Sequence, residues 1–250
     1  MVASLDAGRA ALVLSDEELG AAVMLLAVPE HPSLAEPSSR ATVEALERAG
    51  IVVDGQVRGF PARLLAIVAA PRLRITVEKF VAGAPVVEQA WATEREGVLG
   101  AVTREGDIEL TPVEPSLLPW AVSRAVGLGP RECPHEEPID VGAEPFGQAA
   151  EAVARRDDDA AEAALEACEA SATLLGVLRE RRLSWTATSA WTGIDGEQRV
   201  QSVAVLDAGA EGLWLTRHEG EPPAATVHLE PVRPSVVWER IVALMPSEDA

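Results

Sequence analysis

The chain has 250 residues, of which 48% are hydrophobic, and this is ample for a packed core. Its formal net charge of −19 divides into −6 for residues 1–125 and −13 for residues 126–250. Because nucleic-acid affinity comes largely from Lys and Arg that replace phosphate counterions, this charge argues against a nucleic-acid partner and against an anionic membrane surface.

The sequence shows no sign of a targeting segment or a membrane span. The longest apolar runs, residues 21–28 and 64–70, fall far short of the about 20 residues that cross a bilayer. No basic cluster precedes an apolar stretch at the N-terminus. Cys133 and Cys168 form neither a disulfide framework nor a zinc spacing, so both are expected to be free thiols. We therefore expect a cytoplasmic protein without membrane insertion.

Helices and then strands are expected in the first half of the chain. Helical segments cover residues 16–27 and 40–49, and residues 62–75 are predicted to be a helix that runs into a strand. Four strand-like runs follow, separated by Gly or acidic turns: Leu73–Val81, Val86–Thr93, Val98–Arg104 and Ile108–Val113. Leu73, Ile75 and Val77 alternate with polar residues, which indicates an antiparallel sheet with one solvated face.

The second half repeats this order. Residues 172–185 align without a gap to residues 62–75 at an offset of 110. Residues 229–235 (LEPVRPS) repeat residues 110–116 (LTPVEPS) at an offset of 119, with five of seven positions identical. In each copy prolines end a strand and a Ser is placed to cap the following helix. The change of offset requires nine extra loop residues in the second copy.

The repeat predicts an α+β fold with a quasi-two-fold axis, in which antiparallel sheets are flanked by helices. Helices are expected over residues 145–155 and 159–171, and strands over Leu183–Trp191, Arg199–Leu206, Leu213–His218 and Ala224–Leu229. We expect a first unit at residues 1–128, a linker at 129–144 and a second unit at 145–250, together forming one compact domain. The Pro- and Gly-rich segment 129–142 is expected to be exposed.

A phosphate-binding loop is not expected. The only lysine, Lys79, lies inside a predicted strand, and Gly127-Leu-Gly129 follows a helix and lacks a third glycine, so it is better explained as a helix C-cap. Cys133, His135, Glu136 and Glu137 offer metal-ligand types within five residues, but further ligands are missing. A polar linker explains these four residues better than a metal site does, although any role of Cys133 and His135 stays open.

Other candidate residues are better explained by structure than by chemistry. His218 and His228 fall in neighbouring predicted strands and could face one another, whereas His31 lies in a Pro-rich loop. The six Trp residues fit core packing, with Trp120 and Trp214 the best candidates for an outward position. No catalytic, cofactor-binding or metal-binding residue is assigned, and we expect no cofactor and no enzyme activity.

The duplicated unit, the strand end Leu-Thr-Pro-Val-Glu-Pro and the closing helix Val-Trp-Glu-Arg-Ile-Val-Ala-Leu-Met-Pro resemble the EspG family of actinobacterial type VII (ESX) secretion. The resemblance extends over nearly the whole chain and includes the segment 46–55. It implies a central antiparallel sheet between helical bundles, and a cytosolic chaperone that holds the aggregation-prone tip of a PE–PPE heterodimer until secretion. No active site is implied.

The same resemblance implies contacts from a sheet hairpin, here near Arg95–Gly97, and from helices of the second half, here Pro145–Ser171. Individual partner-binding residues stay unknown. The first hairpin turn is short and charged, which leaves room for an ESX client other than a PE–PPE pair. Two alternatives stay open: a small-ligand-binding protein or enzyme that uses a groove between the two sheets, and a homodimer or larger homo-oligomer that pairs through an exposed sheet edge.

Overall fold

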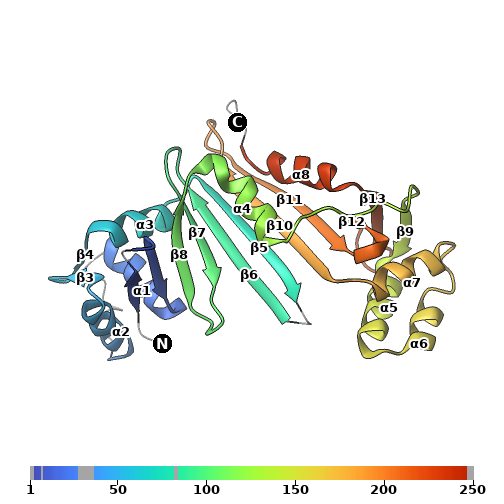
Figure 1. The fold of residues 1–250 in the computed structure, drawn as a ribbon, viewed down its shortest axis with the longest axis horizontal. Coiled ribbons are helices and arrows are strands. Elements are labelled where there is room, and N and C mark those ends of the chain that lie inside the picture. The colour runs from blue at the N-terminus through green and yellow to red at the C-terminus, as the bar shows by residue number, and fades with distance from the viewer. Residues whose placement is uncertain (1–2, 7, 28–36, 82–83, 247–250) are drawn as a thin grey trace.

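The structure, a computed structural model, describes residues 3–6, 8–27, 37–81 and 84–246. Eleven strands form one antiparallel sheet in the order β1-β2-β8-β7-β6-β5-β10-β11-β12-β13-β9 (Figure 1). They are β1 Ser4–Asp6, β2 Ala11–Leu14, β5 Leu73–Val81, β6 Ala84–Ala92, β7 Gly97–Val102, β8 Ile108–Val113, β9 Ile139–Gly142, β10 Leu183–Thr192, β11 Gln198–Asp207, β12 Leu213–Glu219 and β13 Thr226–Val232. A separate small hairpin joins β3 (Val52–Val53) to β4 (Gln56–Val57).

The helices lie close to the predicted positions. They are α1 Asp16–Ala27, α2 Pro37–Arg48, α3 Gly59–Ala69, α4 Leu118–Ala125, α5 Ala143–Arg155, α6 Asp158–Ala164, α7 Ser171–Arg179 and α8 Pro234–Ala243. The helix predicted over residues 159–171 is wrong in length, because α6 ends at Ala164 and a turn with buried Leu165 separates it from α7. Both expected helix-to-strand segments are present, as α3 before β5 and α7 before β10.

The centre of the sheet is the ladder between β5 and β10. Eight pairs join the strands, from Leu73 with Trp191 to Phe80 with Ser184, and Val77 pairs with Ala187. Val77 and Ala187 are also counterparts in the repeat at the offset of 110, so the quasi-two-fold axis passes through this pair. A groove between two separate sheets, which one of the alternatives requires, does not form at this ladder, because backbone hydrogen bonds join the two halves into one continuous sheet.

The nine extra residues of the second copy lie in its hairpins. Leu73 pairs with Ala92 in the first copy, and its counterpart Leu183 pairs with Asp207, so the offset has risen to 115 at β6 and β11. The same comparison gives 116 at β7 and β12, and 119 at β8 and β13. The repeat read from the sequence is thus confirmed strand by strand.

The outer strands complete the symmetry and correct one expectation. β2 pairs with β8 through Leu12 and Leu110, and β9 pairs with β13 through Ile139 and Leu229, the counterpart of Leu110. β9 lies inside the segment that the sequence predicts as an exposed linker. Its Ile139 and Val141 are buried, since they pack below the helices of the second half.

Helices cover the two faces of the sheet differently. α4 and α8 pack over the middle of one face and enclose a cluster that contains residues of both halves, including Ile75, Val77, Trp185 and Trp191. On the other face, α1–α3 cover one end of the sheet and α5–α7 cover the other end (Figure 1).

Candidate partner-binding surface

The middle of the second face is not covered by any helix among the described residues. It is formed by the alternate residues of β5 and β10 that point away from α4 and α8, and by the adjoining halves of β6 and β11. Because the two helical bundles cover only the ends of this face, the uncovered strands form the floor between them. We call this surface the open face.

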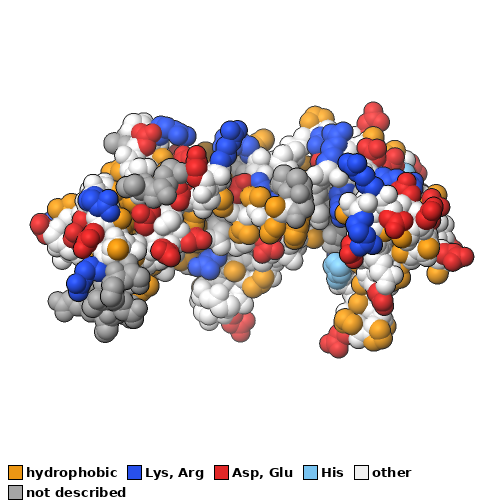
Figure 2. All heavy atoms as spheres, turned by 90° about the horizontal axis from the view of Figure 1, so that it is seen from below, with side chains coloured by type: hydrophobic (Ala, Val, Ile, Leu, Met, Phe, Trp, Pro, Cys, Tyr) orange, Lys and Arg blue, Asp and Glu red, His pale blue; other side chains and the backbone are white. Residues whose placement is uncertain are grey.

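Small hydroxyl side chains, exposed apolar side chains and the two exposed charged residues Arg74 and Glu78 share the open face. Thr76 pairs with Thr188, and Glu78 pairs with Thr186. The exposed apolar residues are Phe80, Val87, Val102 and Val200, of which Val200 is 66% exposed. Figure 2 shows hydrophobic side chains gathered where the molecule is hollowed between two projections. Such a floor can hold an apolar partner surface at little desolvation cost, because few charges have to be stripped of water.

A hollow of about 200 Å³ lies on the open face beside α1. Val87, Gln89, Gly100 and Val102 contribute to its lining. Gly100 has a packing reason: a Cβ at this position would lie 2.7 Å from the ring of Trp91. The absent side chain lets the buried Trp91 fill the space below α1–α3 and leaves the hollow above it.

The two regions that the family resemblance implies as contacts lie apart. Arg95–Gly97 lies at the turn between β6 and β7, and Glu96 in this turn forms an ion pair with Arg63 of α3. Residues 145–171 form α5, α6 and the turn after α6, which pack against β9, β13 and α7 at the other end of the molecule (Figure 1). A partner that touched both would have to extend across the sheet.

The residues considered for metal binding have other partners. His135 Nε2 lies 2.6 Å from Glu211 Oε2, and Cys133 Sγ donates to the backbone carbonyl of His135. Glu136 and Glu137 are exposed. Within the described part of the chain, no group of three or more His, Cys, Asp or Glu residues is placed to hold a metal ion.

His218 and His228, which could have faced one another as a pair, do not do so. His228 pairs across the ladder with Arg217, whereas His218 pairs with Val227, so the two rings point to opposite faces of the sheet. His228 Nδ1 lies 2.7 Å from Asp140 Oδ1 and joins β13 to β9. His31 lies outside the described residues.

The two Trp residues expected to point outward differ. Trp120 is 63% exposed, as predicted, and its ring centroid lies 4.5 Å from that of Trp238. The prediction that Trp214 points outward is wrong, because this residue is 0% exposed. Its indole Nε1 donates to the carbonyl of Glu211 at 2.9 Å. β12 is covered on both faces, since Leu213 packs below α8 while Trp214 packs below α5–α7.

Lys79 and Gly127 both stabilise the C-terminus of α4. Lys79 Nζ donates to the carbonyl of Ala125 at 2.8 Å and forms an ion pair with Glu88. Gly127 has a φ of 63°, and the next amide, that of Leu128, donates to the carbonyl of Ser123. This is the glycine C-cap that the sequence predicts. The only lysine of the chain therefore binds the C-terminus of a helix.

One buried ion pair ties the segment after α4 to the sheet. Arg131 donates twice to Asp207, with distances of 3.1 and 2.8 Å. The hydrogen bond to the Asp207 carboxylate raises the pKa of Arg131 above its already high ordinary value, so the guanidinium stays charged.

The architecture just described occurs in known proteins. No family model and no curated protein matches the sequence. Among solved structures, 14 chains match. One is the Mycobacterium tuberculosis type VII secretion system chaperone EspG5 in complex with a PE25–PPE41 dimer; the TM-score is 0.60 at 14% identity, over 94% of this chain and 97% of that chain.

The chain has an EspG-like fold. Its helices and its large antiparallel sheet agree with the fold that the sequence predicts. The matched protein is a chaperone rather than an enzyme. No helix among the described residues is both long and apolar enough for a bilayer crossing.

The floor of the open face was only partly visible in the sequence. The alternation in β5 predicts a solvated face, but Phe80 and Val200 are apolar residues at solvated positions. An apolar residue in a polar register is the signal that identifies such a surface, and it is meaningful once the pairing partners are known.

Proposed function

We propose that this protein is a cytoplasmic chaperone that holds a helical substrate of a type VII (ESX) secretion system, such as a PE–PPE-like heterodimer, and keeps it soluble for export. The observation that supports this most is the likeness to EspG5 over 94% of the chain. The protein acts by binding, without a cofactor or a catalytic group.

The open face is the surface proposed to hold the substrate. Exposed Phe80, Val87 and Val200 would cover an apolar tip that aggregates in water, and the hydroxyl groups of Thr76 and Thr188, at the centre of this face, would satisfy polar groups of the client. The bundles α1–α3 and α5–α7 would limit the contact on either side. The net charge of −19 favours a client with a basic surface, mainly through its rate of association.

Co-expression tests this proposal. The protein is produced with each helical ESX-type heterodimer encoded near its gene, and tagged complexes are separated by size-exclusion chromatography. We expect one heterodimer to co-elute with the protein and to aggregate when it is produced alone. If every candidate elutes apart from the folded protein, the proposal fails.

Matched substitutions test whether the client binds the open face. Val87→Asp and Val200→Asp put a charge on the open face, whereas Val242→Asp puts the same charge on the exposed side of α8, on the opposite face. Burying an unpaired carboxylate in an apolar contact costs about 1 kcal/mol or more, so each of the first two should weaken client binding about five-fold or more. Equal weakening by Val242→Asp would contradict the assignment to the open face.

Pairing through a sheet edge stays an alternative mode of self-association. The outermost strands, β1 and β9, have three and four residues, whereas residues 198–204 of β11 pair with β10 alone. Because β1 and β9 offer few free backbone groups, we propose that the protein does not pair through these outermost strands and meets its client as a monomer.

A further inference from the structure

In the second half of the molecule, an extended segment lies across the turn between β11 and β12. It begins at Leu128, which packs against the central core cluster, and continues to His135. Arg131 binds Asp207 at the start of the turn, and His135 binds Glu211 near its end. The contact is close: a Cβ on Gly212 would lie 2.9 Å from the carbonyl oxygen of Glu132.

The two-fold repeat places the turn between β6 and β7 in the same position in the first half. By strand register, Ala92 corresponds to Asp207, Arg95 to Glu211 and Glu96 to Gly212. Among the described residues, no segment lies across this turn. Three hollows are found there instead: clefts of about 610 Å³ and about 390 Å³ lie on either side of residues 93–96, and an open hollow of about 790 Å³ is lined by residues 93–96 themselves and Arg72. We call the two clefts together the open groove.

The larger cleft has the chemistry of an apolar side-chain site. Leu73, Leu118, Trp191, Ile194 and Met245 contribute to its lining. It opens onto the same core cluster that Leu128 covers in the other half. Ile194 is 75% exposed at its mouth. An apolar side chain entering here would remove exposed hydrophobic surface, at roughly 25 cal/mol per Å².

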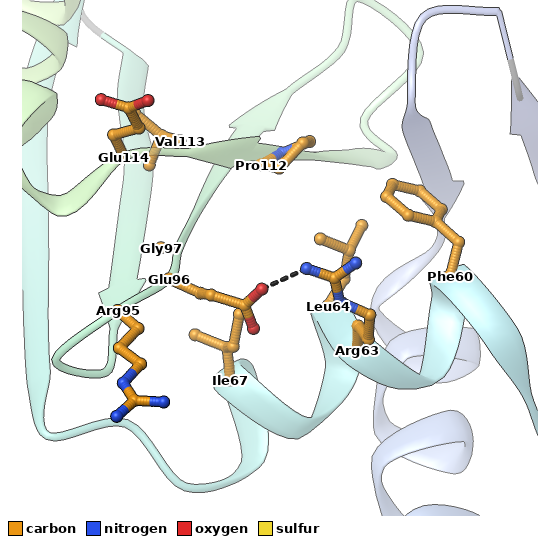
Figure 3. Close-up of a pocket in the computed structure, with 10 residues that line it drawn as sticks. All are labelled: Phe60, Arg63, Leu64, Ile67, Arg95, Glu96, Gly97, Pro112, Val113 and Glu114. Carbon is orange, nitrogen blue, oxygen red and sulfur yellow. Dashed lines mark hydrogen bonds and ion pairs between the residues drawn. The ribbon is translucent and has the colours of Figure 1, made fainter.

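The smaller cleft carries an unpaired cation. Figure 3 shows it between α3 and the turn, with Glu96 directed to Arg63 and the guanidinium of Arg95 apart from that pair. Arg72 pairs with Glu94, so Arg95 is the one arginine of the described clefts without an ion pair. In the filled half the corresponding residue is Glu211, which binds His135. The charge is reversed, so the matching ligand group is a carboxylate.

We propose that the open groove binds an extended segment of a partner protein that carries an apolar side chain and, about seven residues further on, a carboxylate. The spacing is that from Leu128 to His135 in the segment that fills the other groove. The apolar side chain enters the larger cleft and the carboxylate binds Arg95. Because Glu96 stands where the other turn has Gly212, the bound segment lies further from this turn than residues 132–134 lie from theirs.

This interaction uses a different surface from the open face, although its Arg95 lies in the hairpin, Arg95–Gly97, that the family resemblance implies as a client contact. The larger cleft borders α4 and the end of α8, on the side of the sheet opposite to the open face. A segment bound there leaves the open face free for a client. The failure of one proposal therefore leaves the other standing.

A designed peptide pair tests the proposal on the full-length protein. The probe LGPAESPE follows residues 128–135, with Ala in place of the arginine that meets Asp207, Ser in place of the cysteine, and Glu in place of the histidine. The control LGPAESPK differs only in its last charge. Both carry a fluorophore, and binding is followed by fluorescence anisotropy.

We expect the wild-type protein to prefer the Glu peptide by about two- to five-fold, as for an exposed ion pair. Arg95→Glu should reverse this preference. Ile194→Asp should weaken both peptides about five-fold or more. Val200→Asp, a change at a 66% exposed apolar residue on the open face, should alter neither. Circular dichroism confirms that each variant is folded.

The proposal is overturned by any of three results: neither peptide binds at millimolar concentration, Arg95→Glu leaves the preference unchanged, or Val200→Asp weakens the peptides as much as Ile194→Asp does.

Discussion

At the scale of single residues, Trp214 and Trp120 show how differently one side-chain type can be used. Trp214 is fully buried and its indole is hydrogen-bonded, whereas Trp120 lies on the outside of α4. Trp214→Ala should lower the free energy of unfolding by about 3–5 kcal/mol, because it opens a cavity between β12 and α5–α7. Trp120→Ala should change it by less than about 1 kcal/mol. Urea unfolding of both variants compares them directly; similar losses would contradict the assigned burial.

Gly100 offers a second test at this scale. Gly100→Ala would bring a Cβ to 2.7 Å from the Trp91 ring, and overpacking of this kind costs about 1–3 kcal/mol. Gly147→Ala is the matched control: it lies within α5 with no atom within 4 Å of the added Cβ, so it should stabilise the protein by about 0.5–1 kcal/mol. Thermal unfolding should therefore shift in opposite directions, and a rise for Gly100→Ala would refute the packing argument.

Residue patterns predicted burial where only one face of a strand is covered. In β10, the alternation correctly places Trp185 and Ala187 toward the core. It failed for Trp214, because helices cover β12 on both sides and its neighbours Leu213 and Trp214 are both buried. A strand covered twice has no polar register, so alternation carries no information about direction.

At the scale of elements, the long and regular ones were predictable and the short ones were not. The limits of α1, β5 and β8 agree with the prediction to the residue. β1, β2 and β9 have only three or four residues, too few for a period to show. β9 was hidden further by its Pro- and Glu-rich surroundings. Its strand character comes from the partner, β13, rather than from its own sequence.

The Arg131–Asp207 pair fixes the segment that leads to β9. Arg131→Ala would leave the buried Asp207 carboxylate with only the backbone N–H of Gly209, and this should cost about 1–3 kcal/mol. Because the segment is then less restrained, the amides of Ile139 and Val141 should exchange faster than in the wild-type protein. Arg124→Ala, on the exposed side of α4, is the control. Unchanged exchange and stability in Arg131→Ala would show that the pair contributes little.

At the scale of the whole molecule, the sequence predicted the duplication but not how its copies meet. The gapless offset of 110 over residues 62–75 and 172–185 identifies β5 and β10 as counterparts. The offset does not show that β5 and β10 also pair with each other, because this pairing depends on the strand edge that each copy leaves open. The ladder through Val77 and Ala187 closes those two edges against each other.

This arrangement makes the two halves depend on each other for folding. Residues 1–137 alone would expose the whole β5 edge and lose Trp185, Trp191 and α8 from the shared cluster. Residues 138–250 would lose the matching partners, including α4. We predict that each half is aggregated or unfolded when it is produced alone, and that co-expression yields a soluble one-to-one complex with native circular dichroism. A half that is monomeric alone and unfolds cooperatively would show that its own bundle suffices, and that the central ladder joins two independent domains.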